Sequence, residues 1–241
     1  MPKLKSTNSA PIPEKWPSPL PYLTTPQIGP SLPRNILSST NVTQSPSLEA
    51  NTPTMTSPST PYNNIRITPI SDPTHPACGQ AGLFTTRLHA PGEFVCLYMG
   101  LVHGTTGDHV SESAAEVKSD YDLSLDRDLG LAIDAAKMGN EARFINDYRG
   151  VAERPNAEFG DVLVKVGKGV LERHVGVFVK PAKKEKKTGK GKGGYSNVVQ
   201  GIAKGEEVLV SYGRGFWSAR RVEAEAGIGE VGCAVDEFER G

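Results

Sequence analysis

The sequence predicts a strand-rich α+β domain, mainly β, that follows a disordered arm. Two observations carry this prediction. Sixteen of the 19 prolines lie in residues 1–76, so the first third of the chain differs in composition from the remainder. After residue 63, short runs of β-branched and aromatic residues alternate with glycines, which is typical of short strands joined by turns. The 27 basic and 27 acidic side chains cancel, which argues against a chain that coats nucleic acid or a membrane through its overall charge.

The predicted arm covers residues 1–62 and is rich in proline, serine, threonine and asparagine. Its apolar residues stand singly, with neither a helical nor an alternating period. Proline removes backbone donors and fixes φ, and so few apolar residues bury too little surface to offset the entropy of ordering the chain. We therefore expect this Pro/Ser/Thr-rich arm to be disordered.

A single domain is expected over residues 63–217, and it opens with an alternating run at 64–67. The other expected strands lie at 83–84, 94–98, 121–125, 131–134, 161–164, 175–179 and 207–210. Helical patterns are confined to 112–118 and 137–146. Strands that outnumber helices in this way favour an α+β fold with one core.

Two segments differ in charge from the rest of the chain. The Lys/Gly-rich insertion 180–194 holds seven lysines and one glutamate between Lys180 and Lys192. The C-terminal tail 218–241 is acidic, because six acids stand against Arg240 alone after residue 221. A solvated loop and a solvated tail are the simplest interpretation. A second interpretation of the loop is weak contact with nucleic acid or a nucleosome.

Several classes of protein and of site are disfavoured. The three scattered cysteines form neither a disulfide framework nor a zinc cluster, which suits a reducing compartment. No apolar run approaches the length that crosses a bilayer, and the N-terminus lacks a secretory signal, so we expect an intracellular protein without a membrane partner. The five histidines lack metal-ligand spacing, so no metal site is predicted, and no histidine–carboxylate constellation is evident.

Two blocks of sequence are the most informative. Residues 133–146 read IDAAKMGNEARFIN and are followed by PNA at 155–157. Residues 204–213 read KGEEVLVSYG and are followed by Phe216-Trp217. The chain resembles the SET-domain family, whose pattern has these two blocks in this order. The GLF of residues 82–84 and the YMG of residues 98–100 resemble further motifs of that family.

This resemblance implies a fold of small β-sheets with a pseudoknot, S-adenosyl-L-methionine as cofactor, and methyl transfer to a protein lysine side chain. It implies a lysine-bearing protein substrate, either a histone or another protein, and a monomeric protein of chromatin and the nucleus. The basic run 183–187 is similar to a nuclear localisation signal. By the same resemblance the catalytic tyrosines are Tyr212, Tyr98 and Tyr121. The implied cofactor-binding residues are Gly82, Leu83, Arg143, Phe144, Asn146, Asp147, Tyr212 and Trp217.

The implied chemistry is consistent with these residue types. Methyl transfer is an in-line displacement, so it depends on holding the amine and the methyl group close together. Free lysine has a pKa near ~10.4, and apolar and aromatic walls lower it by disfavouring the ammonium form. Tyr212 would orient the amine, while Tyr98 and Tyr121 would line the lysine channel. Trp217 would cover the adenine or pack in the core.

The sequence also departs from the family pattern. Asp147 and Tyr148 stand where the family has His and Ser, so a ring with one donor and one acceptor becomes an acceptor-only carboxylate. The glycine turn reads Gly79-Gln80-Ala81-Gly82 instead of two glycines around one residue. These departures favour a second hypothesis, a SET-like recruitment module without efficient turnover. The retained Tyr212 and Asn146 favour the enzyme.

Overall fold

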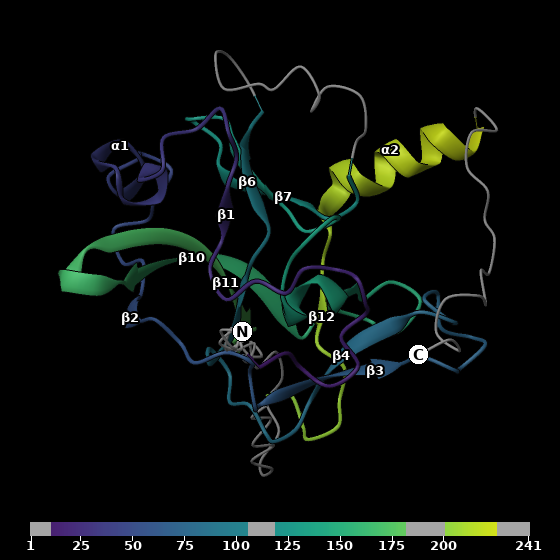
Figure 1. The fold of residues 1–241 in the computed structure, drawn as a ribbon. Helices are drawn as coiled ribbons and strands as arrows, with labels where there is room; N and C mark the ends of the chain where they lie inside the picture. The colour runs from purple at the N-terminus through teal and green to yellow at the C-terminus, as the bar shows by residue number, and fades with distance from the viewer. Residues whose placement is uncertain (1–10, 106–118, 182–200, 226–241) are drawn as a thin grey trace, which may run out of the picture.

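The structure is a computed structural model that describes residues 11–105, 119–181 and 201–225 (Figure 1). Within these ranges the chain forms twelve short strands, arranged in two four-stranded and two two-stranded sheets, and little helix. The predicted mainly β class is therefore confirmed. The expected helix 112–118 and most of the Lys/Gly-rich insertion lie outside the described residues.

The largest sheet has the order β2-β10-β11-β5. Its strands are β2 (Thr54–Thr56), β5 (Phe94–Tyr98), β10 (Ala157–Lys165) and β11 (Leu171–Val179). The antiparallel β10 and β11 form the long hairpin on the left of Figure 1, paired in register from Ala157–Val179 to Lys165–Leu171. Side chains alternate between its two faces, so Val162 and Val164 of β10 enter one apolar cluster while Val175, Val177 and Val179 of β11 enter the main core.

The second four-stranded sheet has the order β1-β6-β8-β7. Its strands are β1 (Gln27–Ile28), β6 (Leu101–Gly104), β7 (Asp122–Asp126) and β8 (Leu131–Asp134). The central β8 is buried because its neighbours pair with it antiparallel on both edges. This sheet carries Tyr121, which directly precedes β7, close to the two-stranded sheets that hold the sequence motifs.

The motif blocks meet in the two smaller sheets. One pairs β3 (Ile65–Pro69) with β4 (Ala81–Thr85), and the other pairs β9 (Asn146–Asp147) with β12 (Leu209–Val210). Residues 202–212 contact both sheets, because the N–H of Val208 donates to the carbonyl of Leu83 at 2.8 Å while β12 pairs in parallel with β9. The C-terminal segment therefore passes between β4 and β9.

In the described part of the chain, helical structure consists of short elements and one longer helix. They are η1 (Ile36–Ser38), α1 (Thr40–Thr43), η4 (Glu141–Phe144), η5 (Gly167–Gly169) and α2 (Gly213–Glu225). Helix α2 projects from the sheets at the upper right of Figure 1. It covers the first residues of the predicted acidic tail, and residues 226–241 lie outside the described part.

The expected helix 137–146 is wrong over most of its length. Only the single turn of η4 is helical. Asn140, just before it, has an extended backbone, and its side-chain amide donates to the carbonyl of Leu97 at 2.8 Å and accepts from the N–H of Met99 at 3.2 Å. This buried side chain completes the hydrogen bonding of the chain next to β5, so tertiary contacts outweigh the local helical pattern.

The predicted disorder of residues 1–62 is also wrong for residues 11–62. Strands β1 and β2 pair in parallel with β6 and β10 at the edges of the two large sheets. Leu37, Val42 and Tyr62 are buried in the main core. The arm has no core of its own, but its isolated apolar residues fill sites in a core that the rest of the chain builds. Composition describes only what a segment can bury by itself, so it misses this case.

Polar contacts attach the arm as well. The hydroxyl of Tyr22 and the N–H of Tyr62 both donate to the buried carboxylate of Glu141, at 3.1 and 2.9 Å. Burial raises the pKa of Glu141 above its ordinary value, and these hydrogen bonds oppose that rise. Ser47 accepts from the guanidinium of Arg173 at 3.3 Å, beside the Arg173–Asp126 ion pair that crosses between the two large sheets.

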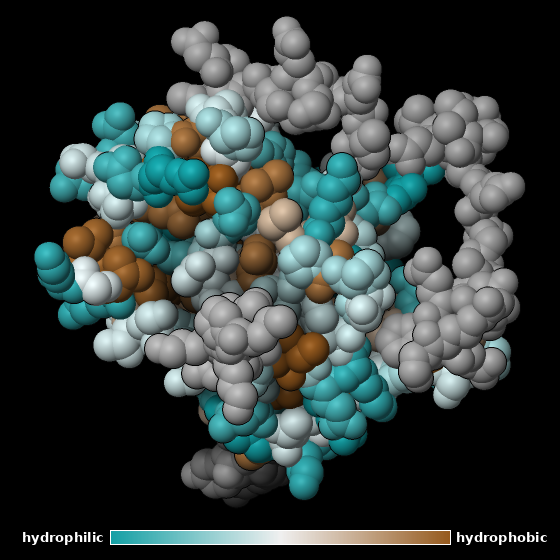
Figure 2. Space-filling view, in the orientation of Figure 1, coloured by the Kyte–Doolittle hydropathy of each residue, from teal (hydrophilic) through white to brown (hydrophobic). Residues whose placement is uncertain are grey.

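The surface shows no single dominant hydrophobic area on the face of Figure 2, where hydrophobic residues lie in small groups among hydrophilic ones. Among described residues, the exposed large hydrophobic side chains are Ile12, Leu88, Val151, Val170 and Tyr212. Most of them lie far apart in the sequence, and single exposed apolar residues of this kind are ordinary. Tyr212 differs from the other four because it lies within a motif block.

The packing of the arm predicts a stability effect that a disordered arm would not show. Leu37→Ala should reduce the free energy of unfolding by about 2–5 kcal/mol, since Leu37 is only 5% exposed. Ile12→Ala is the matched control in the same segment, because Ile12 is 62% exposed and its loss should cost less than about 0.5 kcal/mol. Denaturant unfolding measures both. Equal free energies of unfolding for the two variants would instead support the prediction of a disordered arm.

The second large sheet predicts a pH effect. The Nε2 of His103 lies 2.9 Å from Oδ1 of Asp122, and this hydrogen bond raises the pKa of His103 above its ordinary value. The contribution of the His103–Asp122 pair to the free energy of unfolding is therefore fully present below pH ~6.5, and it is lost as pH rises through the raised pKa of His103. We expect Asp122→Asn to destabilise the protein more at pH 6 than at pH 8.5 in denaturant unfolding. An equal effect at both pH values would show that the pair contributes no proton-linked stability.

Candidate active site

The site forms where the two motif blocks meet at the β9–β12 pairing. Asn146 and Asp147 lie opposite Leu209 and Val210 in this parallel pair. Asn156 fastens the pair from the side: its Oδ1 accepts from the N–H of Leu209 at 2.8 Å, and its own N–H donates to the carbonyl of Leu209 at 3.1 Å. Its Nδ2 also donates to the carbonyl of Glu207 at 2.7 Å. The amide side chain of Asn156 thus satisfies backbone groups of Leu209 and Glu207 that a neighbouring strand would otherwise bond.

Tyr212 lies two residues after the end of β12, and hydrogen bonds hold both its backbone and its hydroxyl. Its N–H donates to Oδ2 of Asp147 at 2.7 Å, and its hydroxyl donates to the carbonyl of Ile145 at 2.7 Å. The residue is 36% exposed, so one side of it faces solvent. Burial of its hydroxyl and the nearby Tyr121, Asp147 and Glu207 raise the pKa of Tyr212, which keeps the phenol protonated.

Tyr98 ends β5 and Tyr121 directly precedes β7, so the two large sheets bring these residues into contact. The buried Tyr98 hydroxyl donates to the backbone carbonyl of Tyr121 at 2.6 Å. Burial and the proximity of Tyr212 raise the pKa of Tyr98, so this phenol also stays protonated. The guanidinium of Arg143 lies 4.6 Å from the centre of the Tyr121 ring, and its Nε donates to the carbonyl of Ala135 at 3.1 Å. The three predicted catalytic tyrosines and Arg143 therefore share one region.

A buried carboxylate lies against the glycine turn. The Oε1 of Glu207 accepts from Nδ2 of Asn146 at 2.8 Å, and its Oε2 lies 3.0 Å from Nε2 of His75. The Nδ1 of His75 accepts from the N–H of Ala77 at 3.0 Å, which leaves the proton on Nε2 and directs it to Glu207. The carboxylate fills the space that a Cβ at Gly82 would need. A glycine is required here because a side chain of this chain approaches its backbone.

The His75–Glu207 contact is a histidine–carboxylate pair beside the motif blocks, where the sequence shows no such constellation. The two residues are 132 positions apart, and no sequence spacing indicates that they meet. Glu207 lies inside the second motif block, so its position was a usable signal, whereas His75 carries none. Both side chains are largely buried, with exposures of 10% for His75 and 8% for Glu207.

The other predicted cofactor residues border this cluster. The carbonyl of Leu83 accepts from Val208, and the Leu83 side chain is fully buried. Phe144 packs beneath Trp16, with ring centres 5.8 Å apart and the rings nearly perpendicular. The arm therefore contributes an aromatic residue beside the first motif block, which no motif in the arm had indicated.

Asp147 has a use of its own in this chain. Its carboxylate accepts from the N–H of Tyr212, from the indole N–H of Trp217 at 3.1 Å, and from both the backbone and the guanidinium of Arg149. Burial alone would raise the pKa of Asp147, but these hydrogen bonds outweigh burial and hold that pKa below its usual value. Both oxygens of this carboxylate thus accept hydrogen bonds, which a histidine side chain with one acceptor nitrogen could not do.

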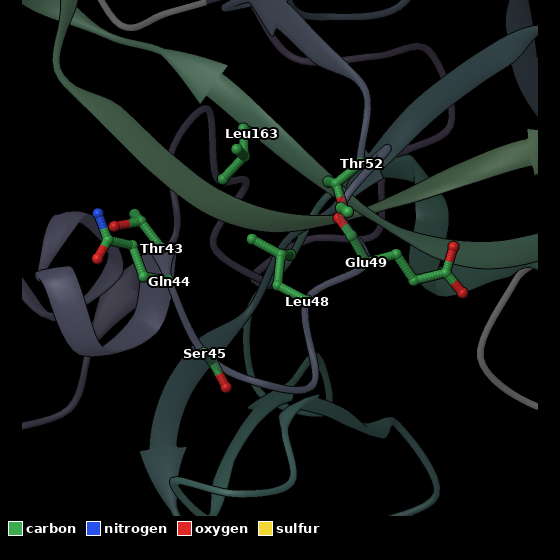
Figure 3. Close-up of a pocket in the computed structure, with 8 residues that line it drawn as sticks. Thr43, Gln44, Ser45, Leu48, Glu49, Thr52 and Leu163 are labelled. Atoms are coloured by element: carbon green, nitrogen blue, oxygen red, sulfur yellow. The ribbon is translucent and has the colours of Figure 1, made fainter.

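A separate cavity of about 290 Å³ lies away from this region (Figure 3). It is enclosed by the segment from Thr43 to Thr52 on one side and Leu163 of β10 on the other, and none of the predicted site residues lines it. Within the described ranges, no group of three or more His, Cys, Asp or Glu residues is arranged to hold a metal ion. In the same ranges no helix has the length and apolar character of a membrane span.

Comparison with known proteins identifies the family. The family model of the SET domain matches residues 80–213, which is more than half of the 241 residues. The chain belongs to the SET-domain family.

Solved SET-domain structures share its fold only distantly. Polycomb repressive complex 2 of Chaetomium thermophilum matches 62% of this chain with 20% identity and a TM-score of 0.40, over 15% of that chain. KRYPTONITE, solved with mCHH DNA, an H3(1-15) peptide and SAH, matches 62% of this chain with 21% identity and a TM-score of 0.39, over 23% of that chain. This chain thus matches less than a quarter of either neighbour's length. A search of the curated proteins finds no match.

The cluster at Gly82 predicts the cost of adding a side chain to this SET domain. A Cβ at Gly82 would lie 3.0 Å from Cδ of Glu207 and 3.0 Å from Cε2 of Phe84, and Glu207 cannot swing away without losing Asn146 and His75. Gly82→Ala should therefore destabilise the protein by about 1–3 kcal/mol in denaturant unfolding.

Gly160→Ala on β10 is the matched control, because a Cβ there meets Phe178 only at ordinary contact distances of 3.4 and 3.5 Å. It should leave stability unchanged or slightly increased. If Gly82→Ala is tolerated as well as Gly160→Ala, the Glu207 carboxylate does not hold the position described above.

Proposed function

We propose that this SET domain transfers a methyl group from S-adenosyl-L-methionine to a lysine side chain of a protein substrate. The observation that carries the proposal is the arrangement of Tyr212. It lies at the junction of the two motif blocks, it is fixed at both ends, and it is partly open to solvent beside Tyr98 and Tyr121. Positioning of this kind is the main requirement of an in-line methyl transfer.

The hydroxyls of Tyr98 and Tyr212 suit the orientation of an amine. Each donates its proton to a backbone carbonyl, so the lone pairs of each oxygen remain available to accept from a substrate N–H. Two such acceptors would turn the nitrogen lone pair toward the methyl group. Because the pKa of both phenols is raised, neither serves as a base at neutral pH.

The amine has to be neutral before it reacts. Aromatic walls and the guanidinium of Arg143 at 4.6 Å from the Tyr121 ring both disfavour a nearby ammonium, and so they lower the pKa of an inserted lysine. Its proton would leave to solvent along the open side of Tyr212. The neutral nitrogen, oriented by the hydroxyls of Tyr98 and Tyr212, would then be able to accept the methyl group that S-adenosyl-L-methionine supplies when bound.

The residues at Gly82 fit the proposed cofactor. S-adenosyl-L-methionine supplies an electrophilic methyl group on a positively charged sulfur and also carries an ammonium group. The buried carboxylate of Glu207, oriented by Asn146 and His75, provides a negative charge for such a cation beside the glycine turn. Gly82, Leu83, Arg143, Phe144, Asn146 and Tyr212 are the residues proposed to contact it, while Asp147 and Trp217 are proposed to border the site without a side-chain bond to the cofactor.

The proposed substrate is a lysine-bearing protein, either a histone or another protein, in the nucleus. The chain is proposed to act as a monomer. Contact of a nucleic acid or nucleosome with the Lys180–Lys192 loop remains a prediction, since residues 182–200 lie outside the described part. The alternative, a recruitment module without turnover, is distinguished by the experiment that follows.

Tyr212→Phe tests the proposal. The variant removes one hydroxyl and leaves the ring packing against Phe216, so melting temperature should hardly change while methyl transfer falls about 10²-fold. The assay uses labelled S-adenosyl-L-methionine with core histones and with a peptide library that has one central lysine, each peptide paired with its arginine counterpart.

Tyr148→Phe is the matched control, because its ring lies under Arg149 and not in the tyrosine group, and it should retain full activity. Turnover of Tyr212→Phe at the wild-type rate would remove Tyr212 from the active site. Cofactor binding by the wild type without transfer to any substrate would favour the recruitment module.

A further inference from the structure

The carboxylate of Asp147 connects three parts of the chain that a SET-type site depends on. It lies at the end of β9, and it receives the N–H of Tyr212 at 2.7 Å, the indole N–H of Trp217 at 3.1 Å and the guanidinium of Arg149 at 2.8 Å. Asp147 is 8% exposed, so these donors replace most of the water that an ionised carboxylate would otherwise bind.

Both anchors of Tyr212 lie within two residues of each other in the sequence. The hydroxyl donates to the carbonyl of Ile145 and the N–H donates to the side chain of Asp147. A shift of the Asp147 carboxylate would therefore tilt the Tyr212 ring about its hydroxyl anchor. Misplacement of a reacting group by about 1 Å is enough to cost about 10²-fold in rate.

The same carboxylate holds the start of α2. The rings of Tyr212 and Phe216 meet at 4.9 Å, the rings of Phe216 and Trp217 meet at 5.3 Å, and the Trp217 indole returns to Asp147. This closes a loop of contacts from β9 through Tyr212 and the first turns of α2 back to β9. Helix α2 is thus tied to Tyr212 directly, by the Phe216 ring, and a second time through Asp147, by the Trp217 indole.

Few other side chains could replace this one. The carboxylate accepts from backbone, indole and guanidinium donors with two oxygens at the same time. An asparagine offers one oxygen, and its amide nitrogen would place N–H groups against other N–H groups. A neutral histidine, the family residue at this position, has a single acceptor nitrogen.

We propose that Asp147 is a positioning residue that fixes Tyr212 and couples the orientation of α2 to it, in place of the side-chain cofactor contact expected at this position. Its effect on catalysis rests on the proposed function, whereas its effect on Trp217 does not. The two interpretations of Asp147 differ in one measurable quantity. A positioning residue affects turnover, and a side-chain contact to the cofactor affects cofactor affinity.

Asp147→Asn is the decisive variant. We expect kcat for methyl transfer to fall about 10²-fold while the Kd for S-adenosyl-L-methionine, measured by calorimetry, stays within threefold. Asp161→Asn on β10 is the matched control, since it removes a carboxylate from the Arg173 pair far along the hairpin and should change neither quantity. A parallel loss of affinity and turnover in Asp147→Asn would overturn the proposal and make Asp147 a cofactor-binding residue.

Fluorescence tests the coupling without any turnover. The chain has two tryptophans, so Trp16→Phe leaves Trp217 as the reporter. In that background Asp147→Asn should increase quenching of Trp217 by acrylamide at least twofold, and unchanged quenching would overturn the coupling. If wild-type protein transfers no methyl group, the proposed function fails while this measurement still decides the role of Asp147.

A second variant tests the coupling in case Asp147→Asn fails to fold. Trp217→Phe removes the indole donor, keeps an aromatic ring beside Phe216, and leaves the bond between Asp147 and Tyr212 in place. We expect about a tenfold decrease in kcat with the Kd for the cofactor within threefold. Wild-type turnover in Trp217→Phe would show that α2 is not coupled to Tyr212.

Discussion

The parallel pairing of β9 with β12 is the contact on which the remaining site geometry depends. It comprises only two residues on each strand, yet it joins motif blocks about sixty positions apart. Asn156 bonds to both sides of Leu209, with its side-chain Oδ1 accepting from the N–H and its backbone N–H donating to the carbonyl, so a pair too short to be stable alone is held in register. Without this register, Asn146 would not reach Glu207 and Asp147 would not reach Tyr212.

Two carboxylates lie on either side of the β9–β12 pair and make different contacts. Glu207 extends from the β12 side toward Gly82 and accepts hydrogen bonds from Asn146 and His75. Its carboxylate places a negative charge at the glycine turn. Asp147 extends from the β9 side and holds Tyr212. In the proposed function, Glu207 would face the cation and Tyr212 would orient the amine, so both proposed roles depend on one short sheet.

The sequence predicts those parts of this structure whose pattern is local. The strands at 94–98 and 131–134 follow from runs of apolar residues, and Tyr212 and Asn146 follow from motif blocks that resemble a family. Long-range contacts were not predictable. His75 meets Glu207 only because β3 and β4 return the glycine turn to residues 202–212, and Leu37 is buried only because another part of the chain leaves room for it. The helical pattern at 137–146 failed because the side chain of Asn140 bonds to residues next to β5.

The central claim is that the β9–β12 junction builds the cofactor site, and calorimetric titration of S-adenosyl-L-methionine into Asn156→Ala tests it most directly. The Asn156 side chain bonds to the backbone of Leu209 and Glu207 and, at 3.4 Å, to the carboxylate of Glu206, and it bonds to none of the proposed cofactor-contacting side chains, so its loss acts on the site through the junction. Unsatisfied partners at the junction cost about 1–3 kcal/mol, and loss of that amount in binding weakens affinity roughly tenfold to a hundredfold relative to wild type. Wild-type protein that binds the cofactor no better than Asn156→Ala, or does not bind it at all, would contradict the account.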